Sequence, residues 1–318
     1  MTMVEITKDN YFSEEVNRKY LSSHNFMDYL KDPVLFYMKN NGYFERRETN
    51  ALVAGTLFHA FVDNEQEFRE IIDNYQPVIF NTRSKTINKD KSALDFIDNG
   101  EIEKLVVKAD FRDVWQFILS NWDVREAIWK VSPYEEREAI LKGEIAGVPF
   151  KGRADRLIFN KSRTRVTIYD YKTIGLKEFY GRYYHEEMER WVEKTFLQEY
   201  GYDLQMYVYK RLVNQMYDIP MDKIDIRMGL LVKSGSTAFI QYQSNFVETE
   251  FIQDEDLLAP RLFGGMTVAD IIDHKAKDAY ELVNQDELPE ELAKESILYN
   301  LYADKKKRQP IPINNIRI

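Results

Sequence analysis

The chain of 318 residues contains no cysteine. This absence excludes disulfides, thiolate zinc sites, cysteine nucleophiles and iron–sulfur clusters held by cysteine. The sequence also lacks a long apolar run that could span a membrane, and it shows no signal-peptide pattern. We therefore expect a cytoplasmic protein without a membrane partner.

Positive charge is in deficit, because 44 lysines and arginines face 53 aspartates and glutamates, which leaves a net charge of −9. This deficit argues against a molecule coated in DNA-binding surface, since non-specific DNA affinity comes from neutralising phosphates. It still permits a local basic groove on an acidic body. The basic clusters available for such a groove, each also explicable as a solvated loop, span residues 83–91, 151–165 and 305–308.

The pattern of apolar residues predicts an alternation of helical and extended segments. Helical periodicity and capping residues predict helices within 11–41 (two short helices), 50–74, 92–130, 184–217 and 253–283. Alternating apolar runs predict strands over 135–145, 148–159, 165–173, 224–233 and 237–243. This order favours one α/β domain over residues 1–318, with a helical N-terminal wing (1–48), a core (50–250) and a helical or extended C-terminal addition (251–318).

The segment from Glu144 to Lys172 contains two alternating apolar runs around a short polar turn, which predicts a β-hairpin. Asp170 and Lys172 share one face of the second strand, because strand side chains alternate with period two. If Asp155 faces them across the hairpin, two carboxylates and one ammonium converge. Hard oxygen ligands suit Mg²⁺, and a nearby lysine suits a phosphate or an activated water. An ion pair alone also explains an Asp-x-Lys pattern, but its place at the end of an apolar strand favours a metal site.

Other polar residues in apolar surroundings have two interpretations each. His59 is either a core histidine or the nitrogen ligand of a mixed metal site. Glu144 is either a solvated carboxylate at a strand end or a further ligand. Gln205 and Tyr209 lie four residues apart and share a helix face, as an amphipathic boundary or as a pair that orients a catalytic side chain.

Taken together, these motifs resemble the PD-(D/E)xK nuclease superfamily, and within it the RecE-like branch of the exodeoxyribonuclease VIII type found in phages and prophages. The match extends from the N-terminal helices to the Gln/Tyr helix. Its motifs are Leu21–Asn25, Leu30–Pro33, Gly55-x-x-x-His59, Glu144, Gly147–Pro149, Lys151–Asp155, Asp170–Thr173 and Tyr202 with Gln205-x-x-x-Tyr209. Two positions depart from the pattern: Ala154 stands where the family has proline, and Asp170 stands where glutamate is commoner.

The resemblance implies a restriction-endonuclease-like core, with a mixed central β-sheet flanked by helices. It implies Mg²⁺, with Mn²⁺ as a substitute, held by His59, Asp155, Asp170 and the Tyr171 carbonyl. Lys172 would position or deprotonate the attacking water, Glu144 would assist, and Gln205 and Tyr209 would support the site or contact DNA. The candidates for contacts to the DNA backbone are Arg153, Arg156, Lys161, Arg163 and Arg165.

The implied activity is metal-dependent 5′→3′ digestion of linear duplex DNA, which generates single strands for recombination. The implied partners are duplex ends, other copies of the chain in a ring, and a RecT-like single-strand annealing protein. The implied setting is a bacterial host cell.

Three alternatives remain at this stage. One is a nuclease of the same superfamily that acts on single strands, flaps or internal sites, and another is a non-catalytic DNA-binding or assembly protein on the same fold. The third is an unrelated helical protein with accidental motifs, which predicts that His59, Asp155, Asp170 and Lys172 do not converge.

Overall fold

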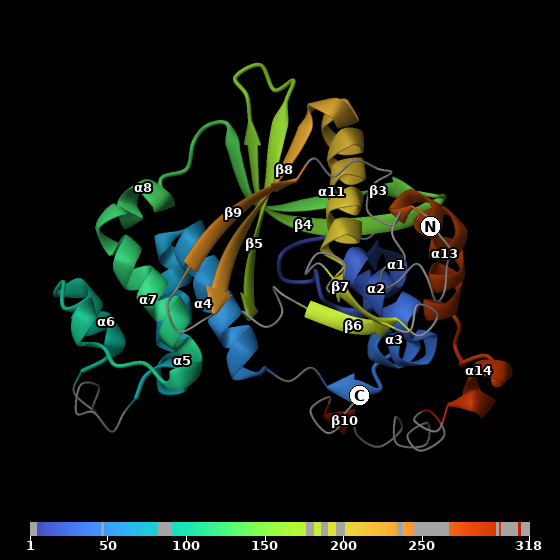
Figure 1. The fold of residues 1–318 in the computed structure, drawn as a ribbon, viewed down its shortest axis with the longest axis horizontal. Helices are drawn as coiled ribbons and strands as arrows, with labels where there is room; N and C mark the ends of the chain where they lie inside the picture. Colours follow the sequence, from blue (N-terminus) through green and yellow to red (C-terminus); the bar gives the residue numbers. More distant parts are fainter. Residues whose placement is uncertain are drawn as a thin grey trace.

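The protein is described from a computed structural model. It covers residues 5–45, 48–81, 91–175, 181–185, 190–194, 201–233, 238–244, 267–296, 299 and 311–312. A central sheet lies between two groups of helices, with helix α11 across the sheet (Figure 1). The first group is α1 (Glu14–Lys19), α2 (Ser23–Lys31), α3 (Pro33–Asn40), α13 (Val268–Val283) and α14 (Glu290–Glu295). The second group is α4 (Asn50–Asp63), α5 (Glu65–Ile79), α6 (Ala93–Asp98), α7 (Arg112–Asn121) and α8 (Arg125–Trp129).

The central sheet is mixed, as the resemblance implied. Its strands are β1 (Leu21–Ser22), β3 (Glu135–Ile145), β4 (Val148–Phe159), β5 (Val166–Gly175), β8 (Ile224–Lys233) and β9 (Ala238–Ser244). Their order is β1-β4-β5-β8-β9, and β3 also pairs with β4. The β4–β5 pair is antiparallel, whereas β5 and β8 are parallel. Because parallel strands need a crossover, α11 (Tyr202–Tyr217) connects them and packs on β3, β4 and β8.

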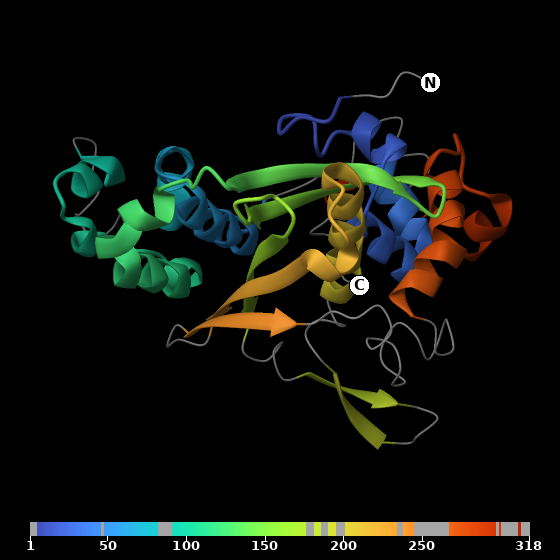
Figure 2. The ribbon, with the colours of Figure 1, turned by 90° about the horizontal axis from the view of Figure 1, so that it is seen from above.

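Two hydrophobic cores meet at the middle of this sheet. The first joins α11, α2, α3 and α13 to the sheet and includes Ile168 and Ile226. The second lies among α4 to α8, which form the separate helical group seen again from above in Figure 2, and reaches the sheet at Leu231. Tyr171 packs against the second core, whereas Val166, Ile168 and Ile174, on the opposite face of β5, belong to the first. The centre of β5 therefore lies between the cores, where a polar site is supported from both sides.

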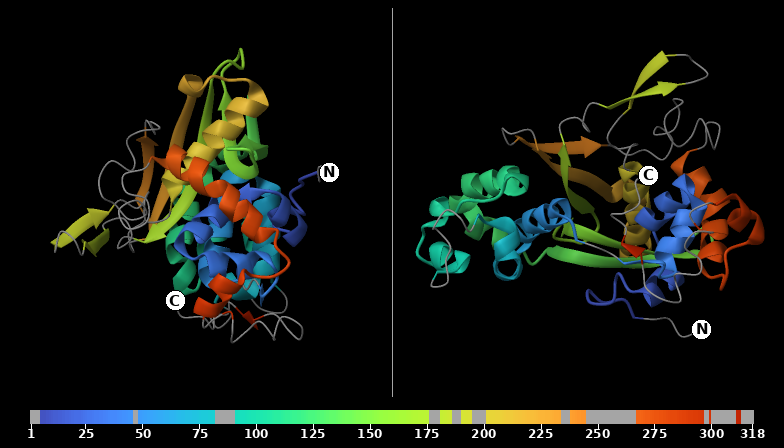
Figure 3. Two further views of the ribbon diagram at one scale, coloured as in Figure 1. Left: turned by 90° about the vertical axis from the view of Figure 1, so that its right-hand side faces the viewer. Right: turned by 90° about the horizontal axis from the view of Figure 1, so that it is seen from below.

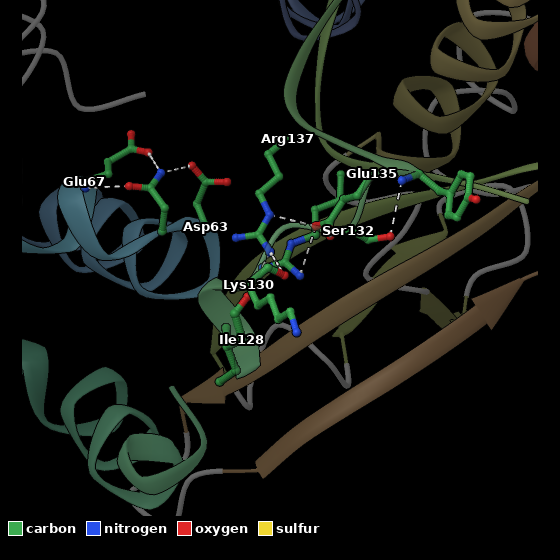
Figure 4. A network of polar contacts seen from close by, with 10 residues as sticks. Asp63, Glu67, Ile128, Lys130, Ser132, Glu135 and Arg137 are labelled. Carbon is green, nitrogen blue, oxygen red and sulfur yellow. Dashed lines mark hydrogen bonds and ion pairs between the residues drawn. The ribbon is translucent and has the colours of Figure 1, made fainter. Parts of the chain in front are cut away.

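The predicted helix over 50–74 is in fact two helices that meet at Asn64. Asn64 has an extended backbone and caps α5 by accepting a 2.8 Å hydrogen bond from the Glu67 amide. Its side-chain amide also donates to the carboxylates of Asp63 (2.7 Å) and Glu67 (3.4 Å), as Figure 4 shows. Helix α5 then continues to Ile79, five residues beyond the end of the predicted helix.

The predicted long helix over 184–217 is wrong in its first half. Strands β6 (Gly181–His185) and β7 (Arg190–Lys194) form a separate antiparallel hairpin with Tyr184 opposite Trp191. This hairpin extends away from the central sheet (Figure 3). Aromatic and β-branched residues favour strands, and this preference outweighed the helical spacing. Helix α11 begins only after Gly201, which adopts a left-handed backbone (φ 64°) and lies so close to Met27 that a Cβ would stand 2.5 Å from its sulfur.

Several predictions fall outside the described residues. These are the start of the strand predicted over 237–243, the N-terminal part of the helix predicted over 253–283, and most of the basic clusters at 83–91 and 305–308. The shorter strands β2 (Phe44–Glu45) and β10 (Ile311–Pro312) pair in parallel. Within the described part of the chain, no helix combines the length and apolar character needed to cross a membrane.

Candidate active site

Asp155 is turned toward the second strand of the hairpin by a change in how β4 and β5 are joined. Their backbone ladder ends at the pair Arg156 and Tyr169. One residue further, the Asp155 carboxylate accepts a 2.5 Å hydrogen bond from the backbone amide of Tyr171. The side chain of Asp155 therefore takes the place of the next ladder bond and lies against the segment that carries Asp170 and Lys172.

Asp170 and Lys172 form a buried ion pair beside it. The Lys172 ammonium lies 2.6 Å from Oδ2 of Asp170, whose side chain is only 1% exposed. The Lys172 ammonium is also 5.3 Å from the centre of the Tyr202 ring, at the start of α11. Burial alone would lower the pKa of Lys172, but the carboxylates of Asp170 and Asp155 raise it above its ordinary value. Lys172 is therefore a fixed cation at neutral pH.

His59 reaches this group from α4, which packs on β5. Its Nδ1 lies 3.5 Å from Oδ1 of Asp155. Burial lowers the pKa of His59, yet the Asp155 carboxylate beside it leaves the pKa raised overall. Gly55, one turn earlier, needs no special explanation, since a Cβ there would make an ordinary 3.8 Å contact with Thr173.

Glu138 completes a cluster that sequence reasoning missed. The β3–β4 register places it opposite Asp155, between the pairs Arg137–Arg156 and Ala139–Ala154. Donor atoms of His59, Glu138 and Asp155 all lie within 4.8 Å of one another. Two carboxylates at that separation repel by roughly 3 kcal/mol at an effective dielectric constant of ~20. Burial raises the pKa of Glu138, and the Asp155 carboxylate raises it further, whereas the nearby Arg153 lowers it.

Glu144, which the resemblance implied would assist at the site, lies elsewhere. It is exposed and stands opposite Pro149, near the turn of the β3–β4 hairpin. At ~3.3 Å per residue, Pro149 is about 20 Å along β4 from Asp155. Its backbone exchanges hydrogen bonds with the side chain of Gln215, at 3.0 and 2.7 Å. The structure therefore does not bring Glu144 to the cluster.

Gln205 and Tyr209 do lie beside the cluster, on the face of α11 that covers the sheet. The Gln205 amide donates to Asp170 (3.3 Å) and to the Tyr209 hydroxyl (2.8 Å), and that hydroxyl donates to the Arg153 carbonyl (2.8 Å). Tyr209 approaches β4 closely enough that a Cβ on Gly152 would be 2.7 Å from its ring. The pair therefore connects β5 to β4 through the helix.

The five basic candidates are dispersed. Arg153 pairs with Glu138 at 2.9 Å and is one-third exposed. Arg156 is 13% exposed, lies 3.4 Å from Glu135 and stacks over the Tyr171 ring, so its guanidinium is not on an open surface. The remaining three, exposed near the tip of the β4–β5 hairpin about 17 Å along the strands from Asp170, are Lys161, Arg163 and Arg165.

The donor set fits a hard divalent cation. It offers the carboxylates of Asp155 and Glu138 with the imidazole of His59, a mixture that Mg²⁺ and Mn²⁺ accept. Asp170, on the neighbouring strand, lies close enough to Asp155 for that carboxylate to raise its pKa. Oδ2 of Asp170 is buried and makes no hydrogen bond in the described part of the chain, apart from its ion pair with Lys172. Burial raises the pKa of Asp170, whereas His59 and Lys172 hold that of Asp155 below its usual value despite burial. A cation beside these carboxylates would offset the free-energy cost of burying their charges and reduce the repulsion between them.

Comparison with known proteins identifies the family to which this fold belongs. Residues 22–253 match the model of a family described as a PDDEXK-like domain of unknown function. The chain belongs to this family. The mixed sheet and its flanking helices are thus a PDDEXK-like, restriction-endonuclease-like fold. No curated protein matches.

Among solved structures, the PDDEXK-like chain is similar to a crystal structure named "Putative exonuclease", from Eubacterium rectale. The TM-score is 0.59 at 17% sequence identity, over 95% of this chain and 99% of the other. This likeness concerns the fold. The family supports a nuclease. PDDEXK nucleases generally use divalent metals, and His59, Glu138 and Asp155 form a possible site for one.

Proposed function

We propose that this PDDEXK-like protein is a Mg²⁺-dependent deoxyribonuclease that digests linear duplex DNA from its ends. The observation that carries the proposal is the convergence of His59, Asp155, Asp170 and Lys172 from α4, β4 and β5. Accidental motifs in an unrelated protein would not meet in this way, and a protein that only binds DNA does not require a lysine paired with a buried carboxylate beside a second carboxylate.

The roles of the side chains follow from their chemistry. Asp155, Asp170, His59 and the Tyr171 carbonyl would hold the cation, with Mn²⁺ as a substitute. When bound, Mg²⁺ supplies Lewis-acid stabilisation of charge on the scissile phosphate. The Lys172 ammonium positions the attacking water and adds a fixed positive charge opposite the developing negative charge. Gln205 and Tyr209 hold the Asp170 carboxylate in place through α11.

The polarity and the assembly rest on resemblance to the RecE-like branch. On that basis the proposal includes 5′→3′ digestion, a ring of several copies and delivery of the single strand to a RecT-like annealing protein, in a phage- or prophage-bearing bacterium. A ring also accommodates a net charge of −9, since basic side chains need only line its channel. Molar mass by light scattering tests the ring, and co-purification with a candidate annealing protein tests the partner.

The central test is digestion of linear duplex labelled at either the 5′ or the 3′ end, with closed circular and single-stranded DNA as controls, in Mg²⁺ and in chelator. Wild type should release label from linear duplex only with Mg²⁺. Lys172→Ala should lose several orders of magnitude in rate, while Lys142→Ala, an exposed lysine on β3, should retain full activity. Cleavage of closed circles would contradict the exonuclease assignment, and preferential attack on single strands would favour the alternative nuclease. Equal rates for Lys172→Ala and wild type would contradict the proposed mechanism.

A further inference from the structure

Glu138 occupies an unusual place in strand β3. Its backbone is left-handed (φ 49°), a conformation that non-glycine residues seldom adopt and that often marks functional sites. Its side chain is 9% exposed, and a carboxylate oxygen lies within 4.8 Å of donor atoms of both His59 and Asp155. The strained backbone thus accompanies a buried carboxylate placed against another carboxylate.

Arg153 neutralises this arrangement only in part. Its Nε lies 2.9 Å from Oε2 of Glu138, while the guanidinium also lies 5.6 Å and 5.4 Å from the ring centres of Tyr11 and Phe12. The Arg153 side chain is one-third exposed, so it can reach a ligand at the surface. A divalent cation between Glu138, Asp155 and His59 would take over the charge compensation that Arg153 gives to Glu138.

We propose that Glu138 is a further ligand of the divalent cation, and that cation binding releases Arg153 from Glu138 to contact a phosphate of the DNA backbone. This inference rests on the proposed function, because it concerns the same metal site. It assigns Glu138 a role that the sequence motifs do not give it. It also makes cation binding and DNA binding mutually reinforcing, since each favours the state in which Arg153 has left Glu138.

The cation part is tested without DNA, by calorimetric titration of the full chain with Mn²⁺. Glu138→Gln should weaken Mn²⁺ binding at least tenfold, whereas Glu144→Gln, an exposed glutamate on the same strand, should leave it unchanged. Glu138→Asp keeps the charge on a shorter side chain, and its Mn²⁺ affinity should lie between those of the two glutamine variants. Arg153→Met should bind Mn²⁺ more tightly than wild type, because it removes a competitor for Glu138. Urea midpoints of all variants separate loss of a ligand from loss of folding.

The DNA part is tested by duplex binding at several salt concentrations, measured by fluorescence anisotropy with Ca²⁺ as the probe cation and again with chelator. With Ca²⁺, Arg153→Met should lower the slope of log affinity against log salt by about 1, the effect of one lost phosphate contact. With chelator the slope should match that of wild type, because Arg153 is then held by Glu138.

Equal Mn²⁺ affinity for Glu138→Gln and Glu144→Gln would overturn the ligand assignment. A slope difference that is the same with and without Ca²⁺ would overturn the release of Arg153. Neither result affects digestion by the wild-type protein, so the inference can fail while the proposed function stands. Absence of digestion with intact Mn²⁺ binding would be the reverse case.

Discussion

The side-chain amide of Gln205 lies 3.3 Å from the Asp170 carboxylate, across 35 residues of sequence. It is the only partner that the described residues show for Oδ1 of Asp170, whose other oxygen faces Lys172. The orientation of a buried carboxylate at the candidate metal site is therefore set from α11, and through Tyr209 from the backbone of β4.

Replacement of Gln205 should affect catalysis more than substrate binding. Gln205→Leu removes the hydrogen bond that orients Asp170, and partners of this kind are typically worth 10- to 100-fold in activity or metal affinity. We expect kcat to fall by roughly that factor with KM little changed. Gln215→Leu is the control, since Gln215 lies on the same helix but bonds the backbone of Glu144. A change confined to KM would instead indicate that Gln205 contacts DNA.

Two glycines near the site should respond oppositely to alanine. Gly152→Ala places a Cβ 2.7 Å from the Tyr209 ring and should displace Tyr209, with a loss of about 1–3 kcal/mol in stability and reduced activity. Gly55→Ala meets only an ordinary 3.8 Å contact inside α4 and should stabilise the protein by about 0.5–1 kcal/mol. Urea unfolding checks both. Destabilisation by Gly55→Ala would show that the space beside Thr173 is needed.

The junction between α8 and the sheet depends on one buried carboxylate, Glu135. Figure 4 shows Arg137 beside Glu135 and the carbonyls of Ile128 and Lys130. Arg137 lies 2.8 Å from Oε1 of Glu135, to which Arg156 also comes within 3.4 Å, and Glu135 is 6% exposed. Glu135→Gln leaves two buried guanidinium groups without their counter-charge and should cost about 3–5 kcal/mol.

The control for Glu135 is its neighbour Glu136, whose side chain is 37% exposed and pairs with Arg163. Glu136→Gln should cost no more than about 1 kcal/mol, as partly exposed ion pairs usually do. Equal losses for the two variants would show that burial of the Glu135 network contributes no extra stability.

Asp203 should make stability depend on pH. Burial at the start of α11 raises the pKa of Asp203 from 3.8 to about 7. The native state therefore binds a proton more tightly than the unfolded chain, and stability is lost as pH rises from about 4 through 7. The full difference corresponds to ~4 kcal/mol. Asp203→Asn should remove this dependence and be the more stable protein at pH 8.

Urea unfolding of wild type and Asp203→Asn between pH 4 and 8 measures the effect. Asp123→Asn, at an exposed position, serves as the control and should follow wild type. Parallel curves for wild type and Asp203→Asn would contradict the raised pKa of the buried carboxyl group.

Much of the site could be predicted because its motifs are local. The β4–β5 hairpin follows from alternation and a polar turn, and the spacing of Asp170 and Lys172 places both on one strand face. Gln205 and Tyr209 share a helix face by periodicity alone. The helix predicted from residue 184, where strands form instead up to residue 194, shows the limit of this approach, since a spacing suited to a helix was outweighed by residues that prefer strands.

The sequence by itself determined the family motifs, the chemistry of the candidate ligands and the order of most elements. Only the tertiary structure decided that His59 reaches Asp155, that Glu138 joins them, and that Glu144 lies about 20 Å along the strand from Asp155. The physical reason is strand register. Glu138 and Glu144 belong to one charged strand, and which of them lies beside Asp155 depends on how β3 pairs with β4 and not on the residues of β3 themselves.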